Sequence, residues 1–600
     1  MQSRKSDNYL IFVIIIIIAN TLIYSTIDFL KYSSYGASVF DLGLSAQTLY
    51  NVTHVGVNAT NLVINKLIYI PLGILYSIYP VPVVLQYIQA FILSLGALPI
   101  YLISRELTGK KGLSLAFSIL WILYYPLGGV YWFDFHFMSL FPTLFLFGIY
   151  FYFKGKTTYS MIFLVLASIT DFLAPVIVAF FAIYVMNRDL SLNGVNPYRN
   201  RLSMPILVIT FAIFLLIVYY YGPSYFLEYI NRQILTYNPQ GSPVEATISY
   251  KVGYFLYLML PLLFLSFAGF EFLLTLVPYV ALAVVNSYYP YVNTIMYQYP
   301  SLTAASLFVA AIIGISRLMK GKKIRISYRN VKRVAVALIA FNIFLAAFLS
   351  PVGNLFTQSH VGNTVTSYMA GMGENYNARS YMDYNPNLSY LNRATLYIPV
   401  GSSILIQDNM PQMVQDYNWT LPFEYNYSLP DRYVAIDTYS PDFTHFYLGK
   451  NSSRNMMYMV NGFLASSTYS IIYQFGGIVY MEEGAHGPSA FSGIRFSMGP
   501  ESISHISNGI DGTILVPGNY TISLFPEISI SAETMNITMQ VLTNPYGIKE
   551  YLNLTLHNDG KGFISYLYLN RFTEIKGLSS NGSGTLSGNL SLQIAQNSVL

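Results

Sequence analysis

The sequence predicts a polytopic α-helical membrane domain of about eleven spans, followed by an outer mixed α/β module and a C-terminal β-sandwich. Composition indicates the membrane domain, because only 10% of the 600 residues are charged and 54% are hydrophobic, with a mean hydropathy of +0.46. Soluble proteins carry about 25% charged residues. Near residue 351 the long apolar runs end, and Tyr, Asn, Ser and Gly predominate. We place the domains at 1–350, 351–486 and 487–600.

Apolar runs in the first 350 residues approach the roughly 20 residues with which a helix crosses a bilayer. The basic Met1–Lys5 precedes the first run, and no small-residue cleavage site follows it, so we expect a retained helix in place of a signal peptide. The stretch 66–80, which ends at the Pro80-Val81-Pro82 break, is interpreted as re-entrant or interfacial. The predicted spans are 9–27, 82–104, 112–132, 137–153, 158–170, 172–187, 204–221, 252–269, 271–286, 300–316 and 334–350.

The distribution of charge predicts the orientation. Residues 1–350 carry 22 Lys/Arg against 10 Asp/Glu, whereas residues 351–600 carry 10 against 17. Lys and Arg are retained in cytoplasmic loops. With a cytoplasmic N-terminus, 18 of the 22 basic residues fall in inner segments, and the outer loops hold only Lys31, Lys66, Arg232 and Lys251. We therefore expect a multi-pass plasma-membrane protein whose C-terminal domains are extracytoplasmic.

Asn-x-Ser/Thr sequons, which accept N-glycans in outer surface segments, agree with this orientation. Eleven occur in the chain, and every one lies on the predicted outer side. An Asn- and Ser-rich chain also produces single sequons by chance. Four of the sequons begin at Asn51, Asn58, Asn581 and Asn589. The predicted glycosylation sites are Asn387, Asn418, Asn426, Asn451, Asn519, Asn536 and Asn553.

Short strands are predicted in both outer domains. In the α/β module they are Thr395–Val400, Ser403–Ile406 and Tyr433–Ile436, with polar turns between them. From about residue 487 apolar and polar residues alternate, which is typical of half-buried strands. A series of such strands separated by turns predicts a β-sandwich. The clearest alternation is in Tyr520–Leu524, Asn536–Val541 and Leu552–Leu556.

Acidic residues are scarce in the first 350 positions, so their placement is informative. Six of the ten lie at outer helix ends or in outer loops: Asp28, Asp41, Asp134, Asp171, Glu228 and Glu245. Ionisable groups at membrane depth are costly and usually line a cavity or a pathway. Asp41, in the first outer loop, fits a general base or a metal-binding carboxylate. An N-cap of the helix predicted after it is the alternative.

Asp134 and His136 flank Phe135 between two spans. This spacing fits two ligands of a divalent metal such as Mg²⁺ or Mn²⁺, or a carboxylate–imidazole pair that transfers protons. A hydrated polar turn at a helix junction is the alternative. Asp171 would complete a three-carboxylate pocket with Asp41 and Asp134, or would cap the next helix.

Four further residues are candidates for substrate binding. Gln47 and Tyr50 lie one and two turns beyond Gly43 if that segment is helical, and would bind polar substrate groups. Lys66 and Arg232 are the outer cations that we expect to contact a lipid-linked phosphate.

Several functions are excluded or unsupported. The chain has no cysteine, so disulfides, thiolate chemistry and Cys-type zinc sites are excluded. No Walker A, Rossmann, HExxH or GxSxG motif is present, so ATP-driven work is unsupported. The basic cluster 317–333 is interpreted as a topology anchor that meets anionic headgroups, and we expect no nucleic-acid partner.

The first outer loop, Val39–Asn51, resembles the FDLG…Q.LWN signature of a prokaryotic family of predicted membrane proteins, domain of unknown function 2079. The likeness covers roughly residues 9–485. Two departures are Asn61–Asn65, where the family commonly has a His, and Thr170, where it often has Lys or Glu before the Asp. Matching stretches follow in order at 85–90, 95–102, 134–137, 170–171, 398–404 and 431–437.

This family is distantly similar to GT-C glycosyltransferases, integral membrane enzymes that take a sugar from a polyprenyl-phosphate donor on the outer face. In them a carboxylate of the first outer loop is the usual catalytic base. The resemblance therefore implies that role for Asp41, with Asp134, His136 and Asp171 as pocket or metal residues. The lipid-linked sugar would enter from the bilayer, and the outer domain would present a cell-envelope glycoprotein or glycan as acceptor.

Two alternatives stay open. One is a non-catalytic, membrane-anchored envelope protein whose β-sandwich binds glycan or a surface partner. The other is a transporter, although no inverted repeat is visible in the sequence. The outer sequons and the large exterior domain resemble archaeal surface proteins, so by analogy we expect an archaeal membrane.

Overall fold

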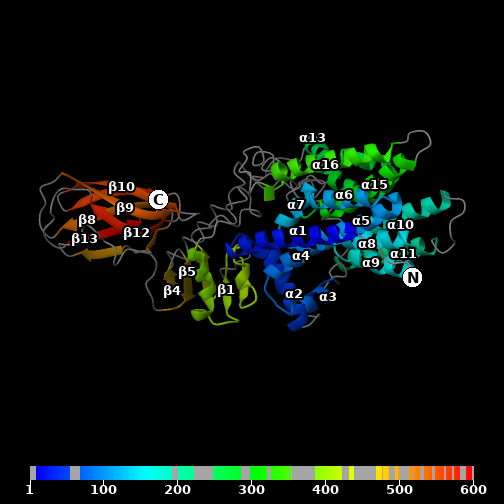
Figure 1. Cartoon of the computed structure of the whole chain (residues 1–600). Helices are drawn as coiled ribbons and strands as arrows, with labels where there is room; N and C mark the ends of the chain where they lie inside the picture. The colour runs from blue at the N-terminus through cyan, green and yellow to red at the C-terminus, as the bar shows by residue number, and fades with distance from the viewer. Residues whose placement is uncertain are drawn as a thin grey trace. The chain divides into compact units, whose positions relative to one another are not determined.

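The computed structural model divides the chain into two units (Figure 1). One comprises Met1–Ser33 and Phe40–Met382, and the other Ser34–Val39 and Asp383–Leu600. The residues that it describes are 8–54, 68–191, 200–221, 248–285, 297–320, 326–350, 352–353, 386–421, 431–437, 468–475, 478–485, 494–498, 513–515, 518–526, 533–543, 548–559, 562–569, 573–580 and 590–596.

Each of the eleven predicted apolar runs coincides with one helix or with consecutive helices of the first unit. The α-helices are α1 Asn8–Ser33, α2 Leu44–His54, α3 Tyr69–Tyr76, α4 Val83–Leu95, α5 Ala97–Thr108, α6 Lys111–Ile122, α7 Tyr125–Trp132, α8 Phe141–Phe153, α9 Thr157–Ser168, α10 Ala174–Ser191, α11 Asn200–Tyr221, α13 Ile248–Met259, α14 Val277–Val285, α15 Ser301–Lys320 and α16 Tyr328–Leu349. Shorter helical segments are the π-helical turn η1 Val39–Gly43 and the 3-10 segments η4 Phe137–Leu140, η5 Leu260–Leu262 and η6 Leu265–Leu276.

Fewer full-length spans are present than the sequence predicts. Within the described residues, five segments are long and apolar enough to cross a membrane: 8–33, 83–108, 265–284, 301–320 and 328–349. The pair α6 and α7, bent by 45°, makes a sixth if it is one span, and five further apolar helices have only 10–17 residues. Turns interrupt several apolar runs, as at Leu263 and Phe264, whose φ angles of 45° and 57° are left-handed. A hydropathy average does not detect such breaks, so it overstates the length of some spans. Five full-length spans still identify the chain as a multi-pass membrane protein.

In the part of the apolar stretch 66–80 that the structure describes, residues 68–80, the helix α3 has only eight residues. At 1.5 Å per residue such a helix rises about 12 Å, against a hydrocarbon core of about 30 Å. It is therefore too short to cross a bilayer alone, in agreement with the interpretation of this stretch as re-entrant or interfacial.

Helix α15 forms the centre of the first unit, with 83% of its apolar window buried. It packs closely on η6, since a Cβ on Gly269 would lie only 2.1 Å from the Ala310 carbonyl oxygen. Small residues let helix backbones approach in this way. By contrast, only 28% of the windows in α1 and α16 is buried. Their exposed apolar side chains, among them Phe12 and Phe344, are suited to contact with lipid.

The second unit begins with a five-stranded sheet in the order β2-β1-β3-β5-β4. Strand β1 is parallel to β2 and β3, and β5 is antiparallel to β3 and β4. The strands are β1 Ser403–Leu405, β2 Asn418–Thr420, β3 Tyr433–Asp437, β4 Tyr469–Phe475 and β5 Ile478–Glu483.

The predicted strands at 403–406 and 433–436 are confirmed by β1 and β3, but the strand predicted at Thr395–Val400 is wrong. The 3-10 helix η9, Pro386–Leu396, continues into it, and turns follow. Pro399 lacks the N–H that a strand ladder requires.

The segment Ser34–Val39 also belongs to this unit. The Ser38 hydroxyl donates to both carboxylate oxygens of Asp408 at 3.0 Å, and the Tyr35 hydroxyl donates to Asn392 Oδ1 at 2.8 Å. Side chains remote in sequence therefore fix this connection after α1.

The remaining strands form one curled eight-stranded sheet in the order β6-β13-β8-β11-β10-β9-β12-β7. The predicted alternating strands are confirmed, but the sheet is continuous, whereas a sandwich has two separate sheets. Its two halves join through only two residue pairs between β10 and β11, compared with ten between β9 and β10. The strands are β6 Ile494–Met498, β7 Thr513–Leu515, β8 Gly518–Pro526, β9 Thr534–Thr543, β10 Ile548–Asn558, β11 Phe563–Leu569, β12 Thr573–Ser580 and β13 Leu590–Gln596.

Two predicted glycosylation sites lie opposite one another on this sheet. Asn536 on β9 and Asn553 on β10 are exposed, and each Oδ1 accepts a hydrogen bond from the threonine of the other sequon. Asn418 is exposed at the start of β2. The side chains of Asn387 and Asn519, and all of Asn426 and Asn451, lie outside the described residues. Glycosylation stays a prediction at all seven.

Candidate functional site

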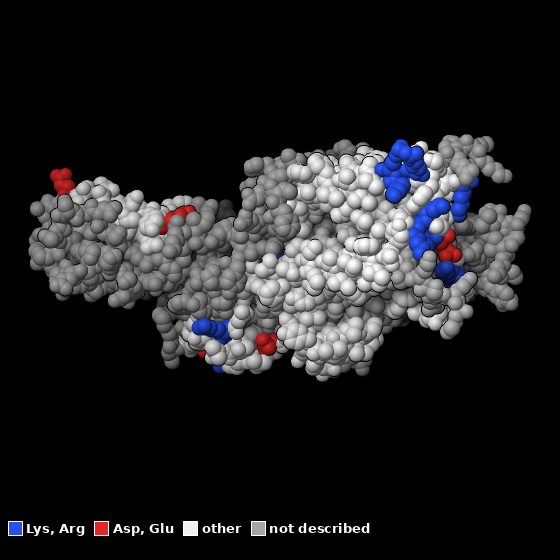
Figure 2. Space-filling model, viewed as in Figure 1, with Lys and Arg blue, Asp and Glu red and all other residues white. Residues whose placement is uncertain are grey.

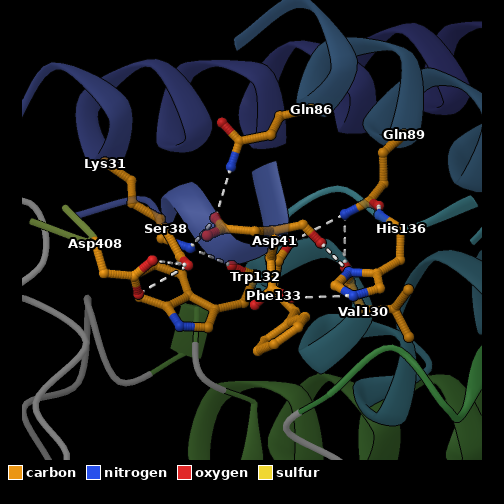
Figure 3. Close-up of polar contacts among 11 residues, drawn as sticks. Lys31, Ser38, Asp41, Gln86, Gln89, Val130, Trp132, Phe133, His136 and Asp408 are labelled. Carbon is orange, nitrogen blue, oxygen red and sulfur yellow. Dashed lines mark hydrogen bonds and ion pairs between the residues drawn. The ribbon is translucent and has the colours of Figure 1, made fainter. Parts of the chain in front are cut away.

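A buried ion pair joins the end of α1 to the turn after α7. Lys31 Nζ donates to Asp134 Oδ1 at 2.7 Å and to the Trp132 carbonyl oxygen at 3.0 Å (Figure 3). Only 5% of Lys31 and 4% of Asp134 is exposed. Gln86 on α4 donates from Nε2 to the same carboxylate oxygen at 3.0 Å. The negative charge of Asp134 is therefore compensated inside the protein.

A second glutamine of α4 fixes the turn that carries His136. Gln89 Nε2 donates to the carbonyl oxygens of Val130 and Phe133, at 2.9 and 3.0 Å. Its Oε1 accepts from the His136 backbone N–H at 3.1 Å. Gln89 lies three residues after Gln86, so both side chains project from one face of the helix. Figure 3 shows both side chains pointing from the helix toward the residues of the turn.

The imidazole of His136 contacts Asp41. His136 Nε2 lies 3.3 Å from Asp41 Oδ1, and Nδ1 lies 2.9 Å from the Asp134 carbonyl oxygen. A carbonyl oxygen can only accept, so Nδ1 carries a proton, and the contact with Asp41 requires a second proton between Nε2 and the carboxylate. Burial lowers the pKa of His136, but the charge and hydrogen bond of Asp41, together with the backbone hydrogen bond and charge of Asp134, raise this pKa above its ordinary value.

Asp41 lies within the π-helical turn η1, three residues before Leu44, where α2 begins. This differs from the alternative in which Asp41 is the N-cap directly before a helix over 42–50. Turns of π-helix are rare in proteins, and those that occur are often found at functional sites. The turn brings the carboxylate to the imidazole of a residue 95 positions further along the chain.

Asp171 lies in the turn between α9 and α10. Its Oδ1 accepts from the Leu173 backbone N–H at 2.9 Å, so it satisfies a donor at the start of α10 in the manner of the predicted cap. Burial raises the pKa of Asp171 to about 6, and the positive charge of His136 opposes this increase. Asp171 is therefore within electrostatic range of His136.

We expect Asp171→Asn to stabilise the protein at pH 7–8 and to have little effect near pH 4. The folded-state pKa of about 6 exceeds the unfolded value of about 3.9, so the folded state binds the proton more tightly and wild type loses stability as pH rises through 6. The asparagine keeps the acceptor for Leu173 and removes the charge. The difference at pH 8 is on the order of 3 kcal/mol, at 1.36 kcal/mol per pKa unit.

Thermal unfolding midpoints of both proteins between pH 4 and 8 measure this effect. A constant difference across that range would contradict it.

The predicted substrate-binding residues are less well defined. Gln47 on α2 donates from Nε2 to Asn51 Oδ1 at 2.9 Å, and its buried Oε1 has no hydrogen-bond partner among the described residues. The Tyr50 ring stacks on His54, with 3.9 Å between centroids. Lys66 and Arg232 lie outside the described residues.

The residues predicted as metal ligands do not fit a metal. The Asp134 carboxylate pairs with Lys31 and Gln86, while the His136 imidazole is held between Asp41 and a backbone carbonyl. A metal would need both side chains to turn toward one point. In the part of the chain that the structure describes, no group of three or more His, Asp or Glu side chains could hold an ion.

Three residues of the site were not among the predicted site residues: Lys31, Gln86 and Gln89. The sequence marks Lys31 only as one of four outer cations, of which Lys66 and Arg232 are the ones predicted to contact phosphate. The signal for the glutamines was present, because both interrupt an otherwise apolar run at a spacing of three. Their partners, however, lie more than 40 positions away.

The fold and the site define a multi-pass membrane protein with a polar, ion-paired site at one end of its helical unit. The chain belongs to the family described as predicted membrane protein (DUF2079), whose model matches residues 31–479. The predicted membership is thus confirmed. No curated protein matches the chain.

Among solved structures, the chain is similar to the apo oligosaccharyltransferase of Archaeoglobus fulgidus, with 9% identity, a TM-score of 0.39 and 97% of each chain covered. It is similar to apo ArnT from Cupriavidus metallidurans, with 11% identity, a TM-score of 0.42, and 78% of this chain and 97% of that chain covered. A third similar structure is arabinosyltransferase EmbB from Mycobacterium smegmatis, at 12% identity and a TM-score of 0.32, covering 96% and 64%. These likenesses assign neither a reaction nor a substrate to this chain.

Proposed function

We propose that the chain is a GT-C-like glycosyltransferase that uses a polyprenyl-phosphate-linked sugar on the outer face of the membrane. The observation behind the proposal is the contact between Asp41 and His136. The Lys31–Asp134 ion pair holds the turn that contains His136. A carboxylate and an imidazole that share a proton are suited to general acid–base catalysis. The resemblance of the first outer loop to the family signature supports the same carboxylate.

The arrangement along α1 supports the proposed orientation. Near its start, Tyr9 lies beside Gly112, which follows the basic Lys110 and Lys111 in the chain, whereas Lys31 near its end belongs to the site. Basic residues therefore gather at the end of the helical unit away from the site (Figure 2). Because cytoplasmic loops retain Lys and Arg, this arrangement favours a cytoplasmic N-terminus and an outer site.

The proposed reaction is displacement at the anomeric carbon of the donor sugar. Asp41 takes the proton of the acceptor hydroxyl or amide, the acceptor atom bonds to the anomeric carbon, and the bond from that carbon to the phosphate oxygen breaks. Polyprenyl phosphate leaves with the electron pair of that bond. His136 orients Asp41 and provides a second place for the proton. The acceptor proposed is a cell-envelope glycoprotein or glycan.

The test is transfer of radiolabelled sugar from polyprenyl-phosphate donors to an envelope extract by the purified full-length protein. We expect transfer to rise with pH through the raised pKa of His136, since the shared proton must leave before Asp41 accepts another. In His136→Gln this step of the pH profile is expected to disappear, with slower transfer. Absence of transfer with every donor, or an unchanged profile in the variant, would exclude the proposed role.

A further inference from the structure

A cluster of three cations on α16 has no partner in the part of the chain that the structure describes. Arg329, Lys332 and Arg333 are exposed and lie at i, i+3 and i+4, so their side chains share one face of the helix. No ion pair or hydrogen bond of these side chains is present among the described residues. Lys and Arg in blue gather at this end of the helical unit in Figure 2.

Other basic residues at this end differ, because they already have partners. Lys154 pairs with Glu106 at 2.6 Å, and Arg317 pairs with Glu271. Lys320 donates to the Leu107 carbonyl oxygen at 2.7 Å. The described acidic residues near these loops are therefore occupied, and the charge on α16 is uncompensated.

The position of the cations within α16 increases this imbalance. They lie in the first two turns, where the helix dipole is positive, and no acidic residue is present in the first turn. Cations are unfavourable at a helix N-terminus, whereas a bound anion is favourable there. The arrangement is thus complementary to a phosphate group.

The same face continues as an apolar stripe. Val336, Ile343 and Phe344 follow Arg333 at helical spacing, with 61%, 54% and 57% of their surface exposed. The 22 residues of α16 rise about 33 Å, close to the 30 Å hydrocarbon core of a bilayer. If the stripe faces the acyl chains, the cations lie at the depth of the headgroups.

We propose that Arg329, Lys332 and Arg333 bind the phosphate of an anionic membrane phospholipid, whose acyl chains lie along the apolar stripe of α16. The ligand combines a negative headgroup with a long apolar tail, which matches the order of charge and apolar surface along the helix. The proposal is independent of the transferase activity.

The experiment titrates full-length protein in phosphatidylcholine-containing micelles with dioctanoyl phosphatidylglycerol and follows the thermal unfolding midpoint. Each cation near a membrane surface contributes about 1 kcal/mol, so the triple variant R329Q/K332Q/R333Q is expected to bind about 100-fold more weakly. The control K154Q/R317Q/K320Q removes the same charge at the same end from cations that already have partners in the protein, and it is expected to bind as wild type does. If the triple variant fails to fold, Arg333→Gln alone is expected to bind about fivefold more weakly.

If both triple variants bind the lipid equally weakly, the attraction is a diffuse effect of charge and no defined site exists. If neither variant binds more weakly than wild type, the site is excluded. A stabilisation that inorganic phosphate reproduces would assign the cations to a free anion. A dimer that the α16 variant alone abolishes, without lipid dependence, would assign the face to a second copy of the chain. Each of these results would overturn the proposal.

Discussion

Asp41→Asn is expected to lower sugar transfer by about 10²–10⁴-fold, the range that one general base contributes. Asparagine has the shape of aspartate but cannot take a proton from the acceptor. Since the change is isosteric, donor binding is expected to change less than the rate. Single-turnover transfer from a radiolabelled polyprenyl-phosphate donor measures the chemical step, and donor binding is measured separately.

The matched control is Glu106→Gln, which removes one carboxylate at the opposite end of the helical unit, where Glu106 pairs with Lys154. It is expected to transfer at the wild-type rate. If Asp41→Asn folds as wild type and transfers sugar equally fast, Asp41 is not the base. A non-catalytic envelope protein would then be the better interpretation.

Lys31→Met is expected to destabilise the helical unit by about 3–5 kcal/mol, the cost of breaking a buried ion pair from one side. The substitution keeps an apolar stem but removes the positive charge that compensates the buried Asp134 carboxylate, to which Gln86 donates as a neutral group. Detergent-titrated unfolding in mixed micelles, followed by circular dichroism, measures the change.

Two further variants separate the buried charge from general damage. Lys31→Met combined with Asp134→Leu removes both members of the ion pair, so the Asp134 charge is no longer stranded and we expect much of the lost stability to return. Lys154→Met breaks the half-exposed pair with Glu106 and is expected to cost only about 0–1 kcal/mol. Equal destabilisation by Lys31→Met and Lys154→Met would show that burial of the Lys31–Asp134 pair does not increase the cost of breaking it.

Much of the fold was accessible from the sequence because it rests on local pattern. Apolar runs and strand alternation are repeated over many residues, and they located the helices and the strands such as β8, β9 and β10. The strand expected at 395–400 was wrong because a six-residue apolar pattern does not distinguish a strand from a helical turn. Among the described residues fewer full-length spans are present than predicted, because short breaks, as at Leu263, leave hydropathy unchanged.

The candidate site divides in the same way. The sequence by itself determined which groups are available: an outer-loop carboxylate at Asp41, the Asp134–His136 turn, Asp171 and two glutamines in an apolar run. Only the tertiary structure decided that Lys31 compensates Asp134 and that His136 turns to Asp41. A charged or polar residue within an apolar segment is a local feature, which can be recognised in a single sequence. Pairing depends on which of several carboxylates each cation reaches after the helices pack, and that is set by contacts about 100 positions apart.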